Sequence, residues 1–166
     1  RQVCIADYDN DGNLDVFITD QQGSSPRQLT FDSQDDMVSQ FSSCGKYILF
    51  NSQRESKQFA TWQVPLDGGV PRHVCPLEST HGSLSSDGSQ FLFQKGYAGQ
   101  YRLGYRGVAA TSIWVLDLNT NTPTQLTDHI WNDRSPVWSH NEQSIFYISE
   151  ESGQQNIHRL DLNSSS

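Results

Sequence analysis

A short segment that recurs three times limits the folds open to this chain more than any other feature of its sequence. Each copy has an apolar residue followed by serine, then a polar turn, then a tight apolar run. The copies occupy residues 41–50, 84–93 and 138–147. A strand–turn–strand unit that returns at a fixed period is typical of repeated β architectures. We therefore expect an all-β protein in which one supersecondary unit is repeated.

Two markers show the period of the repeat. The apolar–Ser anchors stand 43 and 54 residues apart, at Phe41, Leu84 and Trp138. Leu-Thr-like pairs stand 45 and 52 residues apart, beginning at Leu29, Val74 and Leu126. A unit of roughly 40 to 50 residues with four short strands is the size of one β-propeller blade. The sequence predicts blades of four antiparallel strands.

The markers divide the chain into four blades. The first lacks its first strand, and the last lacks its fourth. The third contains an insertion at residues 95–107. The blades cover residues 1–30, 31–76, 77–128 and 129–166. We expect an incomplete, fragmentary propeller of about three to four blades. Since blades are stabilised by their neighbours, we also expect self-association through open edges, or cover from the remaining domains of a parent chain.

Composition excludes several classes of partner. The chain has 166 residues, and its formal net charge is −8, which disfavours binding to a nucleic-acid backbone. No apolar run approaches the roughly 18 residues of a membrane-spanning helix, so no membrane partner is expected. The three cysteines have no metal or redox spacing and are expected to be free thiols. Free thiols weakly favour a cytoplasmic over a periplasmic location.

Catalytic motifs are missing from the sequence. It has no Gly-x-Ser-x-Gly elbow and no phosphate-binding Gly-rich loop. The five histidines are not paired at metal-ligand spacing, and we expect structural or surface roles for them. We therefore expect no catalytic residue within the chain itself.

The insertion is the first candidate site. It contains glycines, tyrosines and arginines, and aromatic and guanidinium groups are side chains that interfaces favour. The candidate binding residues are Tyr101, Arg102, Tyr105 and Arg106. The alternative is a loop that packs on its own tyrosines.

A run of carboxylates near the start is the second candidate site. Alternating carboxylates with a glycine at the tight turn can supply the oxygen ligands of Ca²⁺. The candidate ligands are Asp7, Asp9, Asp11, Asn13 and Asp15. A full EF-hand loop would need Glu where the chain has Ile18. The alternative is an Asp-Gly hairpin between two strands, and no other cofactor is indicated.

The repeat resembles the blades of TolB-like and tricorn-protease propellers. Those blades carry Ser-Pro-Asp-Gly-Lys before the second strand, and later Asp-x-x-Gly-Gly and Leu-Thr. The matching segments here are 42–46, 85–89, 67–69, 29–30 and 126–127. The proline of the family turn is replaced by Ser43, Ser86 and His140. A more specific likeness to the amino-terminal propeller of tricorn proteases lies in Gly104-Tyr105-Arg106-Gly107, followed by Ile113-Trp114.

This resemblance implies a piece of the six-bladed propeller of a tricorn-like serine peptidase. In that family the catalytic residues lie in later domains, and the propellers act as scaffold and as channels that filter peptides. The expected partners are peptides or a protein, together with the remaining domains of the parent. The alternatives are an independent TolB-like protein-binding propeller, with WD40-like repeats, and a Ca²⁺-dependent repeat module. For the Asp7 segment, the family favours the hairpin.

Overall fold

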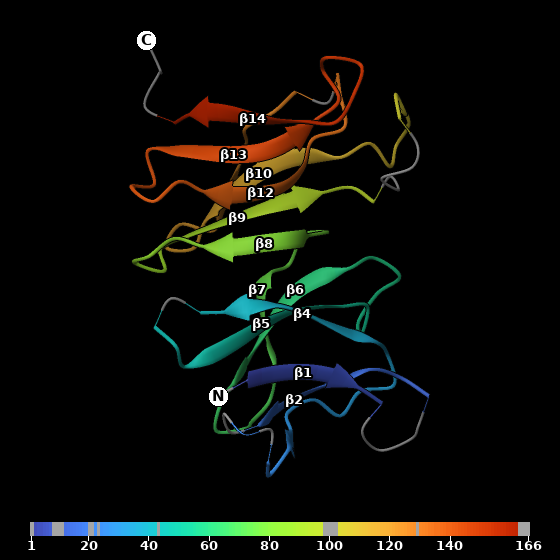
Figure 1. The fold of residues 1–166 in the computed structure, drawn as a ribbon, viewed down its shortest axis with the longest axis vertical. Helices are drawn as coiled ribbons and strands as arrows, with labels where there is room; N and C mark the ends of the chain where they lie inside the picture. Colours follow the sequence, from blue (N-terminus) through green and yellow to red (C-terminus); the bar gives the residue numbers. More distant parts are fainter. Residues whose placement is uncertain are drawn as a thin grey trace. The chain divides into compact units, whose positions relative to one another are not determined.

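The computed structural model describes residues 2–7, 12–19, 22, 24–42, 44–97, 103–128 and 130–162. These residues form fourteen strands and no helix (Figure 1). The strands belong to four antiparallel sheets, and the chain divides into two compact units, Arg1–Glu78 and Ser79–Ser166. None of the described residues belongs to a helix that could cross a bilayer. The chain is all-β, as the repeat predicts.

The first unit contains a three-stranded and a four-stranded sheet. The smaller sheet consists of β1 (Gln2–Ala6), β2 (Asp15–Thr19) and β3 (Arg27–Gln28). The larger sheet consists of β4 (Asp36–Phe41), β5 (Tyr47–Ser52), β6 (Ala60–Pro65) and β7 (Arg72–Cys75). One apolar cluster joins them, with Val16, Ile18 and Leu29 from the smaller sheet and its following turn. Ile48, Phe50 and Val64 from the larger sheet complete its centre.

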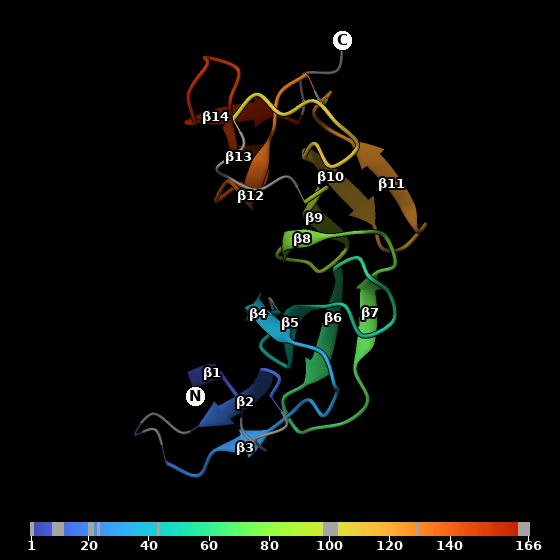
Figure 2. The ribbon, with the colours of Figure 1, turned by 90° about the vertical axis from the view of Figure 1, so that its right-hand side faces the viewer.

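The second unit has the same construction. Its four-stranded sheet consists of β8 (Thr80–Leu84), β9 (Gln90–Lys95), β10 (Ser112–Asp117) and β11 (Thr122–Gln125). Its three-stranded sheet consists of β12 (Arg134–Trp138), β13 (Ser144–Ser149) and β14 (Asn156–Asp161). Leu92, Ile113 and Ile145 form the centre of the core between them. In every sheet the strands follow one another in chain order, as Figure 2 shows for β4 to β7.

The serine of the recurring segment has the same role in all three copies. Its hydroxyl accepts a hydrogen bond from the backbone N–H of the residue that opens the second strand. The distances are 3.1 Å for Ser42 and Tyr47, 2.9 Å for Ser85 and Gln90, and 3.2 Å for Ser139 and Ser144. The turn is therefore closed by a short polar side chain that accepts a hydrogen bond from the local backbone. This bond explains why the serine recurs.

The Leu-Thr marker also has a structural cause. The hydroxyl of Thr30 accepts a hydrogen bond from the N–H of Val16 at 2.9 Å, and that of Thr127 accepts one from Ile113 at 3.0 Å. In each case the preceding leucine also donates its own N–H to the same strand residue. Both threonines thus satisfy a buried backbone donor where the last strand of a sheet ends.

We predict that Ser85→Ala lowers the free energy of unfolding by about 1 kcal/mol, because it leaves the Gln90 N–H without its acceptor. The same hydroxyl donates to Asp87 at 2.6 Å and is the main reason that the pKa of that carboxyl is lowered to about 2. The pKa of Asp87 should therefore rise toward its ordinary value in the variant.

Urea denaturation and NMR titration of Asp87 would measure the two effects. Because the lowered pKa favours the folded state above the ordinary Asp range, this contribution is lost as the pH falls toward 2 in the wild type. Ser33→Ala, at an exposed position, is the control. An unchanged Asp87 pKa in Ser85→Ala would contradict the assignment.

Candidate functional site

The segment between β9 and β10 is attached to the three-stranded sheet of its unit through one buried carboxylate. Glu150, which follows β13, is only 3% exposed. Its Oε2 accepts hydrogen bonds from the Gly104 N–H at 2.8 Å and from Asn132 Nδ2 at 3.0 Å. Its Oε1 accepts a charge-assisted bond from Arg134 Nη2 at 3.1 Å. A single side chain therefore fixes residue 104, an arginine and an asparagine in one network.

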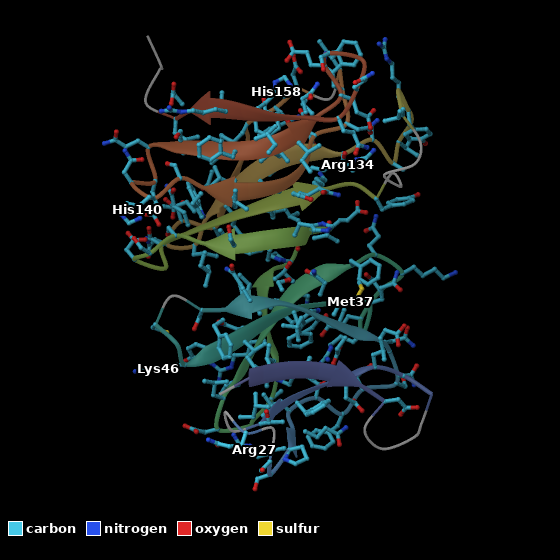
Figure 3. The ribbon with its side chains drawn as sticks, in the orientation of Figure 1. Arg27, Met37, Lys46, Arg134, His140 and His158 are labelled. Atoms are coloured by element: carbon cyan, nitrogen blue, oxygen red, sulfur yellow. The ribbon has the colours of Figure 1, made fainter. Side chains whose placement is uncertain are left out.

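Asn132 extends this network to the rest of the segment. It is fully buried, donates from Nδ2 to the Tyr105 carbonyl at 3.0 Å, and accepts at Oδ1 from the Thr111 N–H at 3.2 Å. Figure 3 labels Arg134, which opens β12 of the three-stranded sheet. The Nε and Nη1 atoms of Arg134 are buried without a hydrogen-bond partner, so Glu150 is the acid that balances its charge. These contacts fix the position of residues 103–110, which we call the 103–110 loop.

The outer side of the 103–110 loop presents apolar and cationic groups to solvent. Val108 is fully exposed, and Leu103 and the neighbouring Tyr97 are mostly exposed. The Arg106 guanidinium lies 5.1 Å from the centre of the Trp131 ring, a cation–π contact at the surface. Exposed apolar groups beside a stacked guanidinium are a composition found at binding interfaces. The arrangement combines a rigid base with a surface suited to a protein or peptide.

Two of the four predicted binding residues, Tyr105 and Arg106, lie in the 103–110 loop, while Tyr101 and Arg102 lie outside the described residues. Arg106 is exposed, whereas Tyr105 is half-buried. A Cβ atom at Gly107 would overlap the Tyr105 hydroxyl, so the glycine leaves room for that ring to fold back onto its own loop. Tyr105 therefore fits the alternative of a self-packed loop, and Arg106 fits a binding role.

The structure describes only part of the predicted calcium segment. Asp9 and Asp11 lie outside the described residues. Asp7 is exposed and accepts a hydrogen bond from the Gly12 N–H at 3.2 Å, while Asp15 is buried in β2 opposite Ala6. No cluster of three potential metal ligands occurs among the described residues. Calcium binding at Asp7, Asp9, Asp11, Asn13 and Asp15 stays a prediction.

Two of the four described histidines, His73 and His158, face acids and aromatic rings. His73 Nε2 lies 2.9 Å from Glu55 Oε2, and its ring packs on Trp62 at 3.6 Å between centres. His158 Nδ1 lies 3.4 Å from Glu151 Oε2. His81 is the exception, because burial lowers its pKa. The contacts of His73 and His158 agree with structural roles for these two residues.

Comparison with known proteins identifies the family. The model of the tricorn protease N-terminal beta propeller domain matches residues 5–166. The chain belongs to this family. A search of curated proteins returned no significant match.

Solved structures share the fold of this tricorn-type propeller chain. TolB from Acinetobacter baumannii superposes with a TM-score of 0.73 and 20% identity, over 92% of this chain and 36% of that one. A putative TolB from Agrobacterium tumefaciens gives 0.70 and 20%, over 91% and 52%. Tricorn protease gives 0.67 and 14%, over 99% and 17%. The chain therefore spans about half or less of each of these structures.

We predict that Glu150→Gln destabilises the tricorn-type propeller chain by about 3 kcal/mol, because it leaves the buried Arg134 without a counter-charge. The Gly104 amide should also lose protection from hydrogen exchange, since its acceptor is weakened.

Chemical denaturation and amide exchange would measure both effects. Glu55→Gln is the matched control, because Glu55 is mostly exposed and its contact with His73 should contribute less than about 1 kcal/mol. Equal losses in the two variants would show that Glu150 does not hold the loop.

Proposed function

We propose that this chain is a non-catalytic propeller module of a tricorn-like serine peptidase, acting as a scaffold and as a gate for peptides. The observation that carries the proposal is the 103–110 loop, with a buried base and an exposed, apolar and cationic outer side. A gate needs a surface that peptides contact and a base that holds this surface in place. The family membership supports a parent enzyme, whose other domains would be the permanent partners.

The chemistry of the outer side suits a peptide. The Arg106 guanidinium is kept near the Trp131 ring, so its N–H groups remain available to peptide carbonyls or to a carboxylate. Leu103 and Val108 offer apolar contact for side chains of any sequence. A site of this kind binds weakly and with little sequence preference, which is what passage through a channel requires.

We predict that a mixture of short peptides binds the chain without being hydrolysed. Arg106→Ala and Trp131→Ala should each reduce affinity several-fold, because each removes one partner of the stacked pair. Arg159→Ala is the matched control, since Arg159 is also an exposed arginine and is paired with Asp161 on β14.

NMR titration would measure binding, and a fluorogenic peptide assay would measure hydrolysis. Hydrolysis that depends on one serine of this chain would overturn the proposal. Capture of a folded protein through Arg106, with no peptide binding, would favour an independent TolB-like binding module instead.

Self-association through open blade edges is a further expectation. It would appear in light scattering as a molecular mass that rises with protein concentration.

The Ca²⁺-dependent module is an alternative to this proposal. Calcium bound by the Asp7 segment would appear as heat in calorimetry, and the absence of binding heat at millimolar calcium would remove this alternative.

A further inference from the structure

The second blade contains an internal receptor for an arginine side chain. Arg54, just after β5, donates from Nη2 to both carboxylate oxygens of Asp36, at 2.8 and 2.7 Å. Its Nε donates to the hydroxyl of Ser52 at 3.3 Å. Asp36 is buried at the start of β4 and pairs with Ser52 in the register of the sheet. The carboxylate and the hydroxyl thus bind one edge of the guanidinium.

Two aromatic rings form the wall of this receptor. The Arg54 guanidinium lies 4.8 Å from the centre of the Phe50 ring and 5.2 Å from that of Trp62. Phe50 and Trp62 face one another across β5 and β6. A carboxylate, a hydroxyl and flat apolar walls together match the charge, the donors and the faces of a planar cation.

The fourth blade repeats the receptor but not the arginine. A shift of 97 residues aligns Phe41 of the second blade with Trp138 of the fourth. The same shift aligns Asp36, Phe50 and Ser52 with Asp133, Tyr147 and Ser149, respectively. Tyr147 faces His158 across β13 and β14, as Phe50 faces Trp62. The same shift aligns Arg54 with Glu151. A carboxylate therefore stands where the second blade has its cation.

Asp133 therefore lacks the arginine partner that Asp36 has in the second blade. It is only 5% exposed, and its Oδ1 has no hydrogen-bond partner. Burial raises its pKa, although hydrogen bonds from Ser149 and Thr127 and the nearby charge of His158 oppose the change. The ring centres of Tyr147 and His158 lie 5.8 Å apart at an angle of 37°, and Figure 3 labels His158 on β14. The Ser149 hydroxyl and both rings therefore lie near this carboxylate, and the same hydroxyl accepts a hydrogen bond from the Glu151 N–H at 3.2 Å.

We propose that Asp133, Ser149, Tyr147 and His158 form a binding site for the guanidinium group of an arginine side chain in a peptide. Arg54 reaches its receptor from the turn after β5, and the corresponding turn after β13 begins with Glu151. Glu151 is 62% exposed, so its side chain can move aside or add a second carboxylate to the cation. The site shares no residue with the 103–110 loop and does not depend on the function proposed above.

The predicted ligand differs from other cations in shape. The second blade binds its arginine through two carboxylate oxygens and a hydroxyl, a set that fits a planar fork better than an ammonium point charge. A metal ion would need at least three close ligands, and no such group occurs among the described residues. Arginine is therefore expected to bind more tightly than lysine.

The first test is an NMR titration of the chain with the peptide Gly-Arg-Gly, followed through the Tyr147 and His158 signals. Gly-Lys-Gly and the citrulline analogue, which is isosteric but neutral, are the reference ligands. We expect the arginine peptide to bind about tenfold or more tightly than either. Asp133→Asn should remove this preference, whereas Asp67→Asn, at an exposed position, should leave it intact.

The second test restores the internal cation. Glu151→Arg should place a guanidinium where Arg54 lies in the second blade, so it should raise the melting temperature and block the arginine peptide. Asp67→Arg is the charge-matched control and should do neither. Equal binding of arginine and citrulline by the wild type would overturn the proposal, and so would binding that survives in both Asp133→Asn and Glu151→Arg.

Discussion

Apolar contact between the two sheets of each unit is the interaction on which the rest of the structure depends. In the first unit Val16 and Ile18 pack with Ile48 and Phe50, and in the second Leu92 and Ile113 pack with Ile145. Because side chains alternate along a strand, burying one set fixes the register of every strand in the sheet. Register then decides where each strand begins and ends, and so which side chains meet at its ends.

Those strand ends are where buried polar groups have to be satisfied. Ser85 and Thr127 bind backbone N–H groups that the sheets leave without partners. Glu150 does the same for Gly104, but it also balances a buried arginine of β12 and so attaches the 103–110 loop to the three-stranded sheet. A neutral side chain such as Ser85 satisfies one N–H group in a single turn. The charged network of Glu150 also positions a whole loop. A loop held in this second way can present Arg106 in a fixed place, which a flexible insertion could not do.

The sequence predicted the blades because their markers are local. Ser42, Ser85 and Ser139 each act on a backbone group five residues away, so their spacing can be recognised without coordinates. The network around Glu150 could not be predicted in this way, because Gly104 and Glu150 are 46 residues apart and meet only after the sheets have packed. Tyr105 and Arg106 were identified as a pair, but the space beside Gly107 decides that only one of them is exposed. Local chemistry was readable, whereas contacts made by packing were not.

Comparison between blades adds information that neither the sequence nor a single site contains. A buried ion pair such as that of Asp36 and Arg54 contributes little net stability, because both groups lose hydration. Losing one partner is far more costly, and in the fourth blade the partner has become Glu151 while Asp133 stays buried. If packing alone mattered, a neutral residue such as Ser79, which occupies this position in the third blade, would avoid that cost. A buried carboxylate that has lost its internal arginine is more easily explained by a guanidinium that comes from outside.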